Sequence, residues 1–327
     1  MPEANLFQEE GCTVDYTAIT AVSGGTVVQL ADGRAGVVPT DVAAADSGSA
    51  SAEGIYVVTK AANLVWIDGA RIWWDHSANA ATPVPPLAAG DKDFYLGIAV
   101  GDVAAATTTG KVNLNVTPVY VYDAHRDLSD TVVVKTVVGS TTVVIPDIVN
   151  RGGSIDAFFG LTTEAQKLDI LSKRSFPLAS NPILECVINV ITTADADVAD
   201  MSIGFANATH ASDADSITES AFFHFDLGAD LNIDAESDDG TTEVAATDTT
   251  LDFAEGTPVF LCIDGRDPSN LKYYVNGAEV LAGTANLGNI ALATGPLKAL
   301  FHLEKSANDS PGRVLIGDLL VRLGLNE

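Results

Sequence analysis

Cysteine, positive charge and long apolar runs are all scarce in this chain, and each shortage excludes a class of protein. Three cysteines among 327 residues, Cys12, Cys186 and Cys262, are too few and too scattered for a disulfide framework. No apolar run approaches the ~20 residues of a membrane span, and the acidic start MPEANLFQEE lacks the apolar centre of a signal peptide. We therefore expect no membrane partner, synthesis in a reducing cytoplasm, and buried thiols at Cys186 and Cys262.

Basic side chains are too few and too dispersed for nucleic-acid binding. Seventeen lysines and arginines face 44 aspartates and glutamates, which gives a formal net charge of −27. Phosphate backbones are bound through clustered basic residues, yet only Lys173 and Arg174 are adjacent in this chain. The charge therefore excludes nucleic acid as a partner.

Short β segments separated by glycine fill the region from Gly24 to Val116. They read GGTVVQL, GRAGVV, EGIYVVTKA, GARIWWD, YLGIAV and GKVNLNV. Glycine adopts the positive φ of tight turns, and β-branched and aromatic residues suit a half-buried pleated surface. Further strand-like segments run to the C-terminus, and only Thr162–Lys173 has the apolar spacing of a helix. The sequence therefore predicts an all-β protein with a single helix.

The order of these segments resembles a family of phage proteins over about the first 120 residues. Five elements carry the resemblance: Gly24–Val28; Gly36 to Val38; Gly54-Ile55 leading to Val58 and Lys60; Gly69 with Trp73-Trp74-Asp75; and Leu96 to Ala99 before Gly110–Val116. They resemble the capsid cement, or decoration, proteins of tailed phages, formerly a domain of unknown function. The resemblance implies a small β-tulip-like barrel that binds the outside of a capsid, commonly as a homotrimer.

A second resemblance covers Ser220 to Leu323. Its strand-like segments are Thr257–Asp264, Leu271–Val280, Leu297–Leu303 and Val314–Arg322. In the second of them, alternating residues lead to Asn276-Gly277, the signature of a type I′ hairpin turn. The pattern is similar to the concanavalin-type jelly-roll sandwich, which implies an architecture and not an activity.

A polar connector separates the two regions. Residues from Val121 to Asp130 include Asp123, His125 and Arg126, which are hard to bury together. Domain boundaries fall in such exposed polar segments. We therefore predict a capsid-binding domain over residues 1–126 and an outward-facing jelly-roll domain over residues 127–327, with GKVNLNVTPVYVY closing the first barrel.

One acidic segment has the spacing of a calcium loop. Asp230, Asn232 and Asp234 match its opening, but Ala235 stands where the loop needs glycine and Thr241 where it needs glutamate. The segment also alternates apolar and polar residues, which favours a strand with an acidic face. A better candidate for a loop-bound cation, or else an ordinary solvated turn, is the cluster that follows: Glu236, Asp238 and Asp239.

No motif points to catalysis. His224 and His302 each lie in an aromatic strand, so they are either cross-strand neighbours forming a paired site or ordinary strand histidines. The chain has no zinc-type H-E-x-x-H, no G-x-S-x-G elbow, no P-loop and no dinucleotide fingerprint. We therefore predict no catalytic residue, no resident metal and no cofactor.

Two groups of residues are candidates for contact with the capsid or a neighbouring subunit. Trp66 and Trp73 are expected on one face and Trp74 on the other, with core the ordinary interpretation and an interface anchor the alternative. The N-terminal residues carry little local structure, so we expect an arm that orders only on docking. The predicted contact residues are Asn5, Leu6, Phe7, Trp73 and Trp74.

Together these features predict a structural virion protein on the outer capsid surface, made in the bacterial host cytoplasm. Its expected partners are the major capsid protein and two further copies of itself. The alternative is a carbohydrate-binding surface protein or receptor-binding fibre that takes a host-surface glycan through the jelly-roll domain. A polysaccharide-cleaving enzyme built on a jelly roll is the third interpretation.

Overall fold

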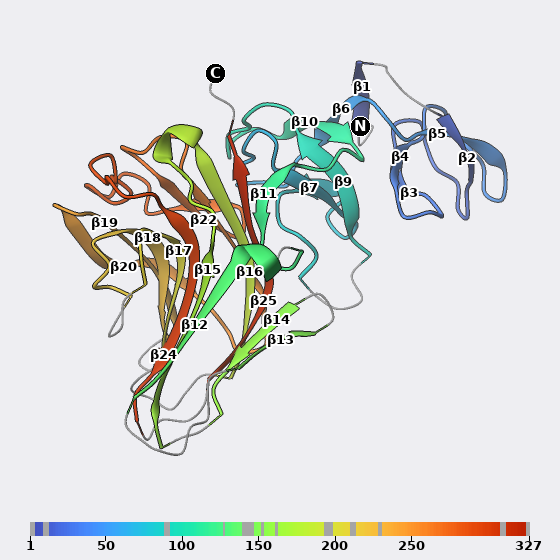
Figure 1. Cartoon of the computed structure of the whole chain (residues 1–327). Helices are drawn as coiled ribbons and strands as arrows, with labels where there is room; N and C mark the ends of the chain where they lie inside the picture. The colour runs from blue at the N-terminus through green and yellow to red at the C-terminus, as the bar shows by residue number, and fades with distance from the viewer. Residues whose placement is uncertain are drawn as a thin grey trace. The chain divides into compact units, whose positions relative to one another are not determined.

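The computed structural model describes residues 4–8, 13–87, 92–126, 128–138, 147–151, 154–160, 163–192, 199–209, 214–227, 231–307 and 312–324. Two short 3₁₀ turns, Leu128–Asp130 and Leu178–Ser180, are the helical elements of these ranges, and every other regular element is a strand (Figure 1). None of the described helices has the length and apolar character needed to cross a membrane. The all-β prediction is confirmed.

The chain divides into two compact units. Unit 1 comprises Met1–Val119 with the turn Asn276–Ala278, and unit 2 comprises Tyr120–Val275 with Glu279–Glu327. The division at Val119 precedes the predicted connector because β11 (Tyr120–Asp123) pairs antiparallel with the last strand of unit 2. The prediction that residues 110–122 close the first barrel is therefore wrong at its end, because Tyr120–Asp123 belongs to unit 2.

Unit 1 contains two antiparallel sheets. One has six strands in the order β1-β6-β10-β9-β7-β8, and the other has four in the order β2-β5-β4-β3. Their bounds are β1 (Ala4–Gln8), β2 (Thr13–Thr17), β3 (Val27–Gln29), β4 (Ala35–Val37), β5 (Ser47–Ser51), β6 (Ile55–Thr59), β7 (Arg71–Asp75), β8 (Ala80–Thr82), β9 (Phe94–Ala99) and β10 (Thr109–Leu114).

The six-stranded sheet of unit 1 curls back on itself around an aromatic core. A parallel bridge between Lys60 and Ala81 joins the end of β6 to β8. Trp66 and Trp74 are 0% and 1% exposed in the core that the sheet encloses. A side chain at Gly110 would put its Cβ 2.2 Å from the Trp66 ring, so glycine is required there by close packing. The sheet is therefore barrel-like.

The arrangement of the tryptophans differs from the prediction. Trp66 shares the core with Trp74, whereas Trp73 is half-buried and packs edge-on against Tyr95 with ring centroids 5.2 Å apart. Trp66 lies before β7 and forms an isolated bridge with Val103, so the intervening turn resets the alternation of faces. The predicted pairing of Trp66 with Trp73 is wrong because it assumed that the alternation of faces continues through the turn.

Unit 2 is a sandwich of two antiparallel sheets (Figure 1). One sheet runs β13-β14-β25-β16-β21-β22-β23, with β11 also on β25, and the other runs β12-β15-β24-β17-β18-β19-β20. Their bounds are β12 (Thr131–Val138), β13 (Asp147–Arg151), β14 (Ser154–Phe158), β15 (Ala165–Ser172), β16 (Pro182–Thr192), β17 (Ala199–Ala206), β18 (Glu219–Asp226), β19 (Asn232–Asp239), β20 (Glu243–Asp252), β21 (Val259–Asp264), β22 (Lys272–Val275), β23 (Ala278–Val280), β24 (Lys298–Lys305) and β25 (Arg313–Leu323).

Side chains from both sheets form one core between them. Leu184 and Ile188 of β16 and Met201 and Ile203 of β17 belong to the same buried cluster. The predicted hairpin turn is also present, because Asn276 and Gly277 have φ values of 48° and 78°. This sandwich confirms the jelly-roll expectation for the C-terminal region.

The helix predicted over Thr162–Lys173 is a strand instead. Its residues Ala165–Ser172 form β15, which pairs with β12 on one side and β24 on the other. Leu168 and Ile170 point into the sandwich core, while Leu171 joins a second apolar cluster on the opposite face. Because a central strand is buried on both faces, its apolar residues do not alternate cleanly, and the spacing was mistaken for a helical one.

Candidate functional site

The outer face of the seven-stranded sheet in unit 2 has a polar part, largely buried, beside the apolar cluster that contains Leu171, Phe222 and Leu300. On β17, Met201 and Ile203 point into the sandwich core, so Ser202 between them points outward. Cross-strand register then fixes which outward residues lie side by side. One row runs Asp169, His302, Ser202, His224, Asp234, and the next runs Lys167, Glu304, Asp200, Asp226. We call these the histidine row and the carboxylate row.

His302 of β24 lies between two carboxylates. Its Nδ1 is 2.7 Å from Asp169 Oδ1 and its Nε2 is 3.1 Å from Glu304 Oε2. Lys167 Nζ also donates to Glu304 Oε2, at 2.5 Å. Burial lowers the pKa of His302, but the hydrogen bonds to Asp169 and Glu304 outweigh it and raise the pKa to about 9. His302 is therefore a buried cation at neutral pH.

His224 of β18 has a different environment in the same row. Its Nδ1 is 3.2 Å from Ser202 Oγ and 3.3 Å from Asp215 Oδ1. Burial lowers the pKa of His224, but the hydrogen bond to Asp215 and the charge of Glu236 raise it to about 9. Desolvation likewise raises the pKa of the nearby Asp200 to about 6. The face therefore concentrates several carboxylates around two imidazoles.

Ser202, His224 and Asp215 have the composition of a catalytic triad but not its geometry. In a triad the serine bonds one imidazole nitrogen and the aspartate the other. Here both contact the same Nδ1, and Ser202 is completely buried. The imidazole therefore has no path for moving a proton from the serine toward the aspartate.

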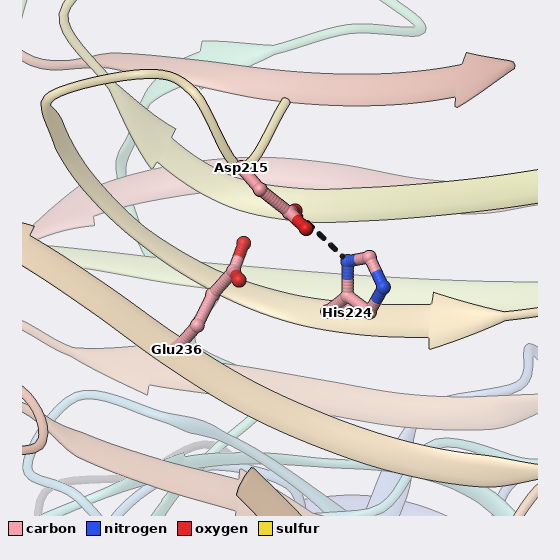
Figure 2. Close-up of side chains that lie close together, drawn as sticks. All are labelled: Asp215, His224 and Glu236. Carbon is pink, nitrogen blue, oxygen red and sulfur yellow. Dashed lines mark ion pairs between the residues drawn. The ribbon is translucent and has the colours of Figure 1, made fainter. Parts of the chain in front are cut away.

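Asp215, His224 and Glu236 form a cluster of metal-ligand type (Figure 2). One potential ligand atom from each of them lies within 4.8 Å of the other two. His224 comes from β18 and Glu236 from β19, while Asp215 comes from the segment before β18. Figure 2 shows the Asp215 and Glu236 carboxylates converging near the His224 ring.

The sequence located only part of this cluster. Asp230 lies outside the described residues, and Asn232 and Asp234 belong to β19 rather than to a calcium loop. Glu236, Asp238 and Asp239 also lie in β19, so the predicted loop is wrong. Asp238 and Asp239 accept hydrogen bonds from the backbone of the turn at residues 240–242, and Glu236 alone joins the cluster.

Two further features of this face could not be predicted from the sequence. Asp215 sits in an Ala- and Asp-rich segment without a motif, so nothing distinguished it from its neighbours. The alternative in which His224 and His302 are cross-strand neighbours is wrong, because Ser202 of β17 lies between them in the register. They nevertheless belong to one row.

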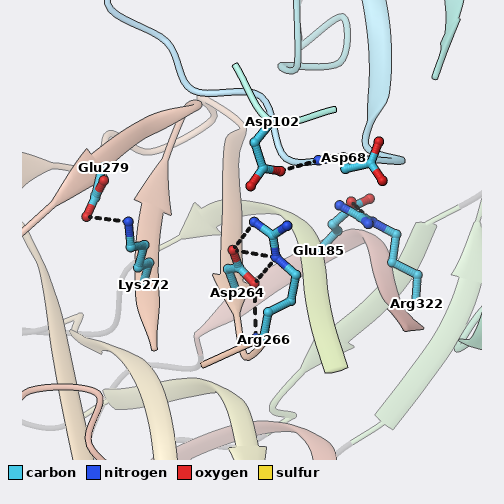
Figure 3. Close-up of polar contacts among 8 residues, drawn as sticks. All are labelled: Asp68, Asp102, Glu185, Asp264, Arg266, Lys272, Glu279 and Arg322. Carbon is cyan, nitrogen blue, oxygen red and sulfur yellow. Dashed lines mark hydrogen bonds and ion pairs between the residues drawn. The ribbon is translucent and has the colours of Figure 1, made fainter. Parts of the chain in front are cut away.

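The eight-stranded sheet also has one buried and one partly buried ion pair. Arg322 Nε donates to Glu185 Oε1 at 2.9 Å, and Arg266 Nη2 donates to Asp264 Oδ2 at 2.9 Å (Figure 3). Burial raises the pKa of the nearby Cys262 thiol well above its ordinary value, and the charges of these two ion pairs act on it as well. Cys186 and Cys262 are both buried free thiols, as predicted, whereas Cys12 lies outside the described residues.

The predicted contact residues of unit 1 differ in their exposure and in the elements that hold them. Asn5, Leu6 and Phe7 lie in β1, which pairs antiparallel with β6, so within this chain the segment is an edge strand and not the unstructured arm expected. Trp74 is enclosed in the core. Among the tryptophans, only Trp73 is partly exposed.

Comparisons with known proteins agree with this two-unit organisation. Residues 7–114 match the family of phage cement proteins, and residues 150–316 match the C-terminal domain of SO2946-like proteins. No curated protein sequence matches the chain.

Solved structures with a similar fold are distant. The potassium-bound carbohydrate recognition domain of Emp46p is 11% identical, with 63% of this chain and 94% of that chain covered and a TM-score of 0.41. The laminarinase from Flavobacterium sp. UMI-01 is 10% identical, with 52% of this chain and 79% of that chain covered and a TM-score of 0.39. A carbohydrate esterase from the Shiga toxin-encoding bacteriophage phi24B is 10% identical, with 58% of this chain and 90% of that chain covered and a TM-score of 0.36. At these values the likeness concerns general β architecture and not activity.

The first family match lies within unit 1, and the second lies within unit 2 apart from Asn276–Ala278 and spans about half of the chain. The resemblance of the N-terminal region to capsid cement is thereby confirmed. The chain belongs to the SO2946-like family through its C-terminal domain, and its residues 7–114 are similar to phage cement proteins.

Proposed function

We propose that this protein is a capsid cement protein that binds the outer surface of a phage capsid through unit 1 and displays unit 2 outward. The observation that carries the proposal is the match of residues 7–114 to phage cement proteins. That region folds as a β unit with its own aromatic core, as a separate binding module requires. The proposed role is structural and not enzymatic.

The net charge of −27 supports the outer face of the shell over the inner one. Packaged DNA fills the capsid interior with phosphate charge, which repels a strongly acidic protein. On the outside, the same charge keeps neighbouring copies soluble and free of nonspecific contacts. The protein is accordingly a virion component made in the host cytoplasm that joins the shell from outside.

Cement of this kind stabilises a shell by mass action. A subunit that contacts adjacent copies of the major capsid protein binds the assembled shell and not the dissociated protein, so binding shifts the equilibrium toward assembly. A homotrimer matches the local three-fold axes of a capsid, and its closed symmetry prevents open-ended growth. We therefore propose the trimer as the binding species.

Trp73 and strand β1 are the proposed contact elements of unit 1. Trp73 is half-buried beside Tyr95, so part of its ring remains available to a partner. Strand β1, which contains Asn5, Leu6 and Phe7, lies at the end of its sheet, and an edge strand can pair with another chain. Trp74 is removed from the predicted contact set because its side chain is 1% exposed.

Quantitative mass spectrometry of purified virions tests the proposal. Cement should be present at a copy number comparable to that of the major capsid protein, whereas a receptor-binding fibre should be present at only a few copies. Virions lacking the protein should also release their DNA at lower temperature than complete virions. Fibre-like copy number, or unchanged thermal stability of depleted virions, would contradict the assignment.

A substitution locates the contact surface. Trp73→Ala should lower virion occupancy, because an aromatic anchor at an interface contributes about 2 kcal/mol or more. Leu292→Ala is the matched control, since Leu292 is a 61% exposed apolar side chain of unit 2. Equal occupancy of the two variants would exclude Trp73 as a contact.

A further inference from the structure

The cluster formed by Asp215, His224 and Glu236 has the donor set of a transition-metal site. One imidazole nitrogen and two carboxylates suit Zn²⁺ or Mn²⁺, whereas Ca²⁺ and Mg²⁺ prefer oxygen ligands alone. Two carboxylates and a neutral imidazole also carry the charge that balances one divalent cation. Among the described residues, this is the one group of three such side chains that converges closely enough.

The distances in the cluster fit a single ion. Two ligand atoms bonded to one Zn²⁺ at about 2.0–2.1 Å in a tetrahedral arrangement lie roughly 3.3 Å apart. His224 Nδ1 and Asp215 Oδ1 are 3.3 Å apart. Glu236 lies within 4.8 Å of both and has a longer side chain with which to approach. An ion would replace the imidazole proton that otherwise joins His224 to Asp215.

The fold holds the three ligands in place. His224 faces Asp234 and Phe222 faces Glu236 in the antiparallel register of β18 and β19, so His224 and Glu236 are diagonal neighbours on one face. Both side chains are buried, at 7% and 6% exposed, so the surrounding sheet restricts their movement.

Asp215 is fixed in a different way. It lies between Ala214 and Ile217, two buried residues that pack on Phe222 and Leu300 of the sheet. The backbone N–H of Ile217 donates to the carbonyl of Ala214, closing a turn around the aspartate. Asp215 is therefore anchored on both sides although its own side chain is 42% exposed.

The exposure of Asp215 gives the cluster an open side. A site closed on all sides could load only during folding, whereas an open side permits exchange and leaves room for a water as a further ligand. The cluster therefore combines two buried ligands, His224 and Glu236, with one exposed ligand, Asp215, on the outer face of the seven-stranded sheet (Figure 2).

From this geometry we propose that Asp215, His224 and Glu236 bind one divalent transition-metal ion, of which Zn²⁺ and Mn²⁺ are the best chemical fits. The ion joins β18, β19 and the segment that precedes β18. It thereby ties that segment to the sheet and stabilises unit 2, independently of where unit 1 binds.

Equilibrium dialysis of the full chain against Zn²⁺ tests the proposal, with Mg²⁺ in excess to occupy nonspecific acidic sites. One equivalent of zinc should remain bound per chain, measured by elemental analysis, and the melting temperature of unit 2 should rise with zinc concentration. Mn²⁺ should compete with Zn²⁺, and Ca²⁺ should not.

Asp215→Asn is the decisive variant, because it is nearly isosteric and changes a side chain that is 42% exposed. It should weaken zinc binding at least tenfold and remove the thermal shift. His224→Gln should do the same, with circular dichroism as the check of its fold. Asp252→Asn and His76→Gln, which alter exposed residues elsewhere, should bind zinc as the unchanged protein does. Absence of stoichiometric binding, or equal binding by Asp215→Asn, would overturn the site and leave an ordinary ion pair.

Discussion

The side chain of Asn115 makes both of the hydrogen bonds to Ala35 that a neighbouring strand would make. Its Oδ1 accepts from the Ala35 N–H at 2.9 Å, and its Nδ2 donates to the Ala35 carbonyl at 2.9 Å. The same Nδ2 also donates to the carbonyl of Ala52 at 2.6 Å. Asn115 follows β10 of the six-stranded sheet and Ala35 begins β4 of the four-stranded sheet, so one side chain joins the two sheets of unit 1.

Replacing this side chain should weaken unit 1. Asn115→Ala leaves the buried Ala35 backbone and the Ala52 carbonyl without their partner, and each unpaired buried group costs about 1–3 kcal/mol. We expect a loss of about 2–4 kcal/mol in the free energy of unfolding of unit 1, measured by urea denaturation of the full chain. Asn113→Ala on β10 is the matched control and should cost less than 1 kcal/mol. Equal losses in the two variants would show that Asn115 does not join the sheets.

The sequence predicted local features better than long-range ones. Alternation and turn chemistry identified the strands, and the Asn276-Gly277 hairpin has the expected positive φ values because a two-residue turn depends on its own residues. The helix error at β15 arose because burial on both faces hides the period of two.

The candidate site depends on register between strands that are distant in sequence. His224 and His302 share a row only because β17 lies between β18 and β24, an order that no local pattern encodes. Asp215 joins them from a segment held by the apolar contacts of Ala214 and Ile217. Strand pairing and side-chain packing, and not residue spacing, assemble these polar groups.

The ion pairs of His302 should make stability fall at alkaline pH. The pKa of His302 is raised to about 9 in the folded protein, against about 6.5 for an unperturbed histidine. A raised pKa contributes stability that is complete below about pH 6.5 and is lost as the pH rises through about 9. The full loss is roughly 3 kcal/mol, at 1.36 kcal/mol for each unit of pKa difference.

Thermal unfolding between pH 6 and pH 10 measures this dependence. The charged groups facing His302 are Asp169 on β15 and Glu304 on its own strand, and Lys167 stays paired with Glu304. His302→Gln should make the fall in melting temperature between pH 7 and pH 9 clearly smaller, and the remainder should come from His224, whose pKa is also raised to about 9. His76→Gln, at an exposed position of unit 1, should leave the fall unchanged. An unaltered pH profile in His302→Gln would assign the effect to other groups.

Glu219 should be essential for the loop that precedes β24. Its carboxylate accepts hydrogen bonds from the N–H groups of Thr294 and Gly295 at 2.8 and 2.7 Å and from Asn207 Nδ2 at 2.9 Å. Desolvation raises the pKa of Glu219, but these hydrogen bonds outweigh it and lower the pKa overall. Its contribution is therefore present above about pH 4.5 and is lost as the pH falls through the lowered pKa.

The variant Glu219→Gln removes the charge and places an amide group against N–H donors. We expect a loss of about 1–3 kcal/mol at pH 7, because hydrogen bonds to a charged acceptor are among the stronger ones. The loss should shrink as the pH approaches 4. Glu243→Gln, at an exposed position on β20, is the matched control. A loss independent of pH would indicate a packing effect and not a charged acceptor.

Removal of residues 1–8 tests the edge strand of unit 1. Strand β6 remains paired with β10 after the deletion, so the fold of unit 1 should persist. If β1 is part of the capsid contact, virion occupancy should fall, because the shortened protein lacks Asn5, Leu6 and Phe7 and exposes the edge of β6 instead. Circular dichroism checks the fold and mass spectrometry of virions measures occupancy. Full occupancy after deletion would remove β1 from the contact.

The boundary between the units should lie before β11. Tyr122 of β11 is 1% exposed, belongs to the sandwich core and hydrogen-bonds Thr131 through its hydroxyl at 3.1 Å. A fragment of residues 128–327 lacks β11, so it should be less stable than a fragment of residues 120–327 by about 3–5 kcal/mol, the usual cost of deleting a large core aromatic. Equal stability of the two fragments would restore the later boundary predicted by the polar connector.

The same division should separate the proposed roles. Residues 1–119 contain all of the cement-family match, so this fragment should still occupy capsids that lack the full protein. Residues 120–327 should fold, since they hold the complete sandwich core, and should not bind capsids. Sedimentation of each fragment with purified shells, followed by mass spectrometry, measures both outcomes. Binding by the isolated sandwich would reverse the assignment of the capsid contact to unit 1, even with the boundary in the expected place.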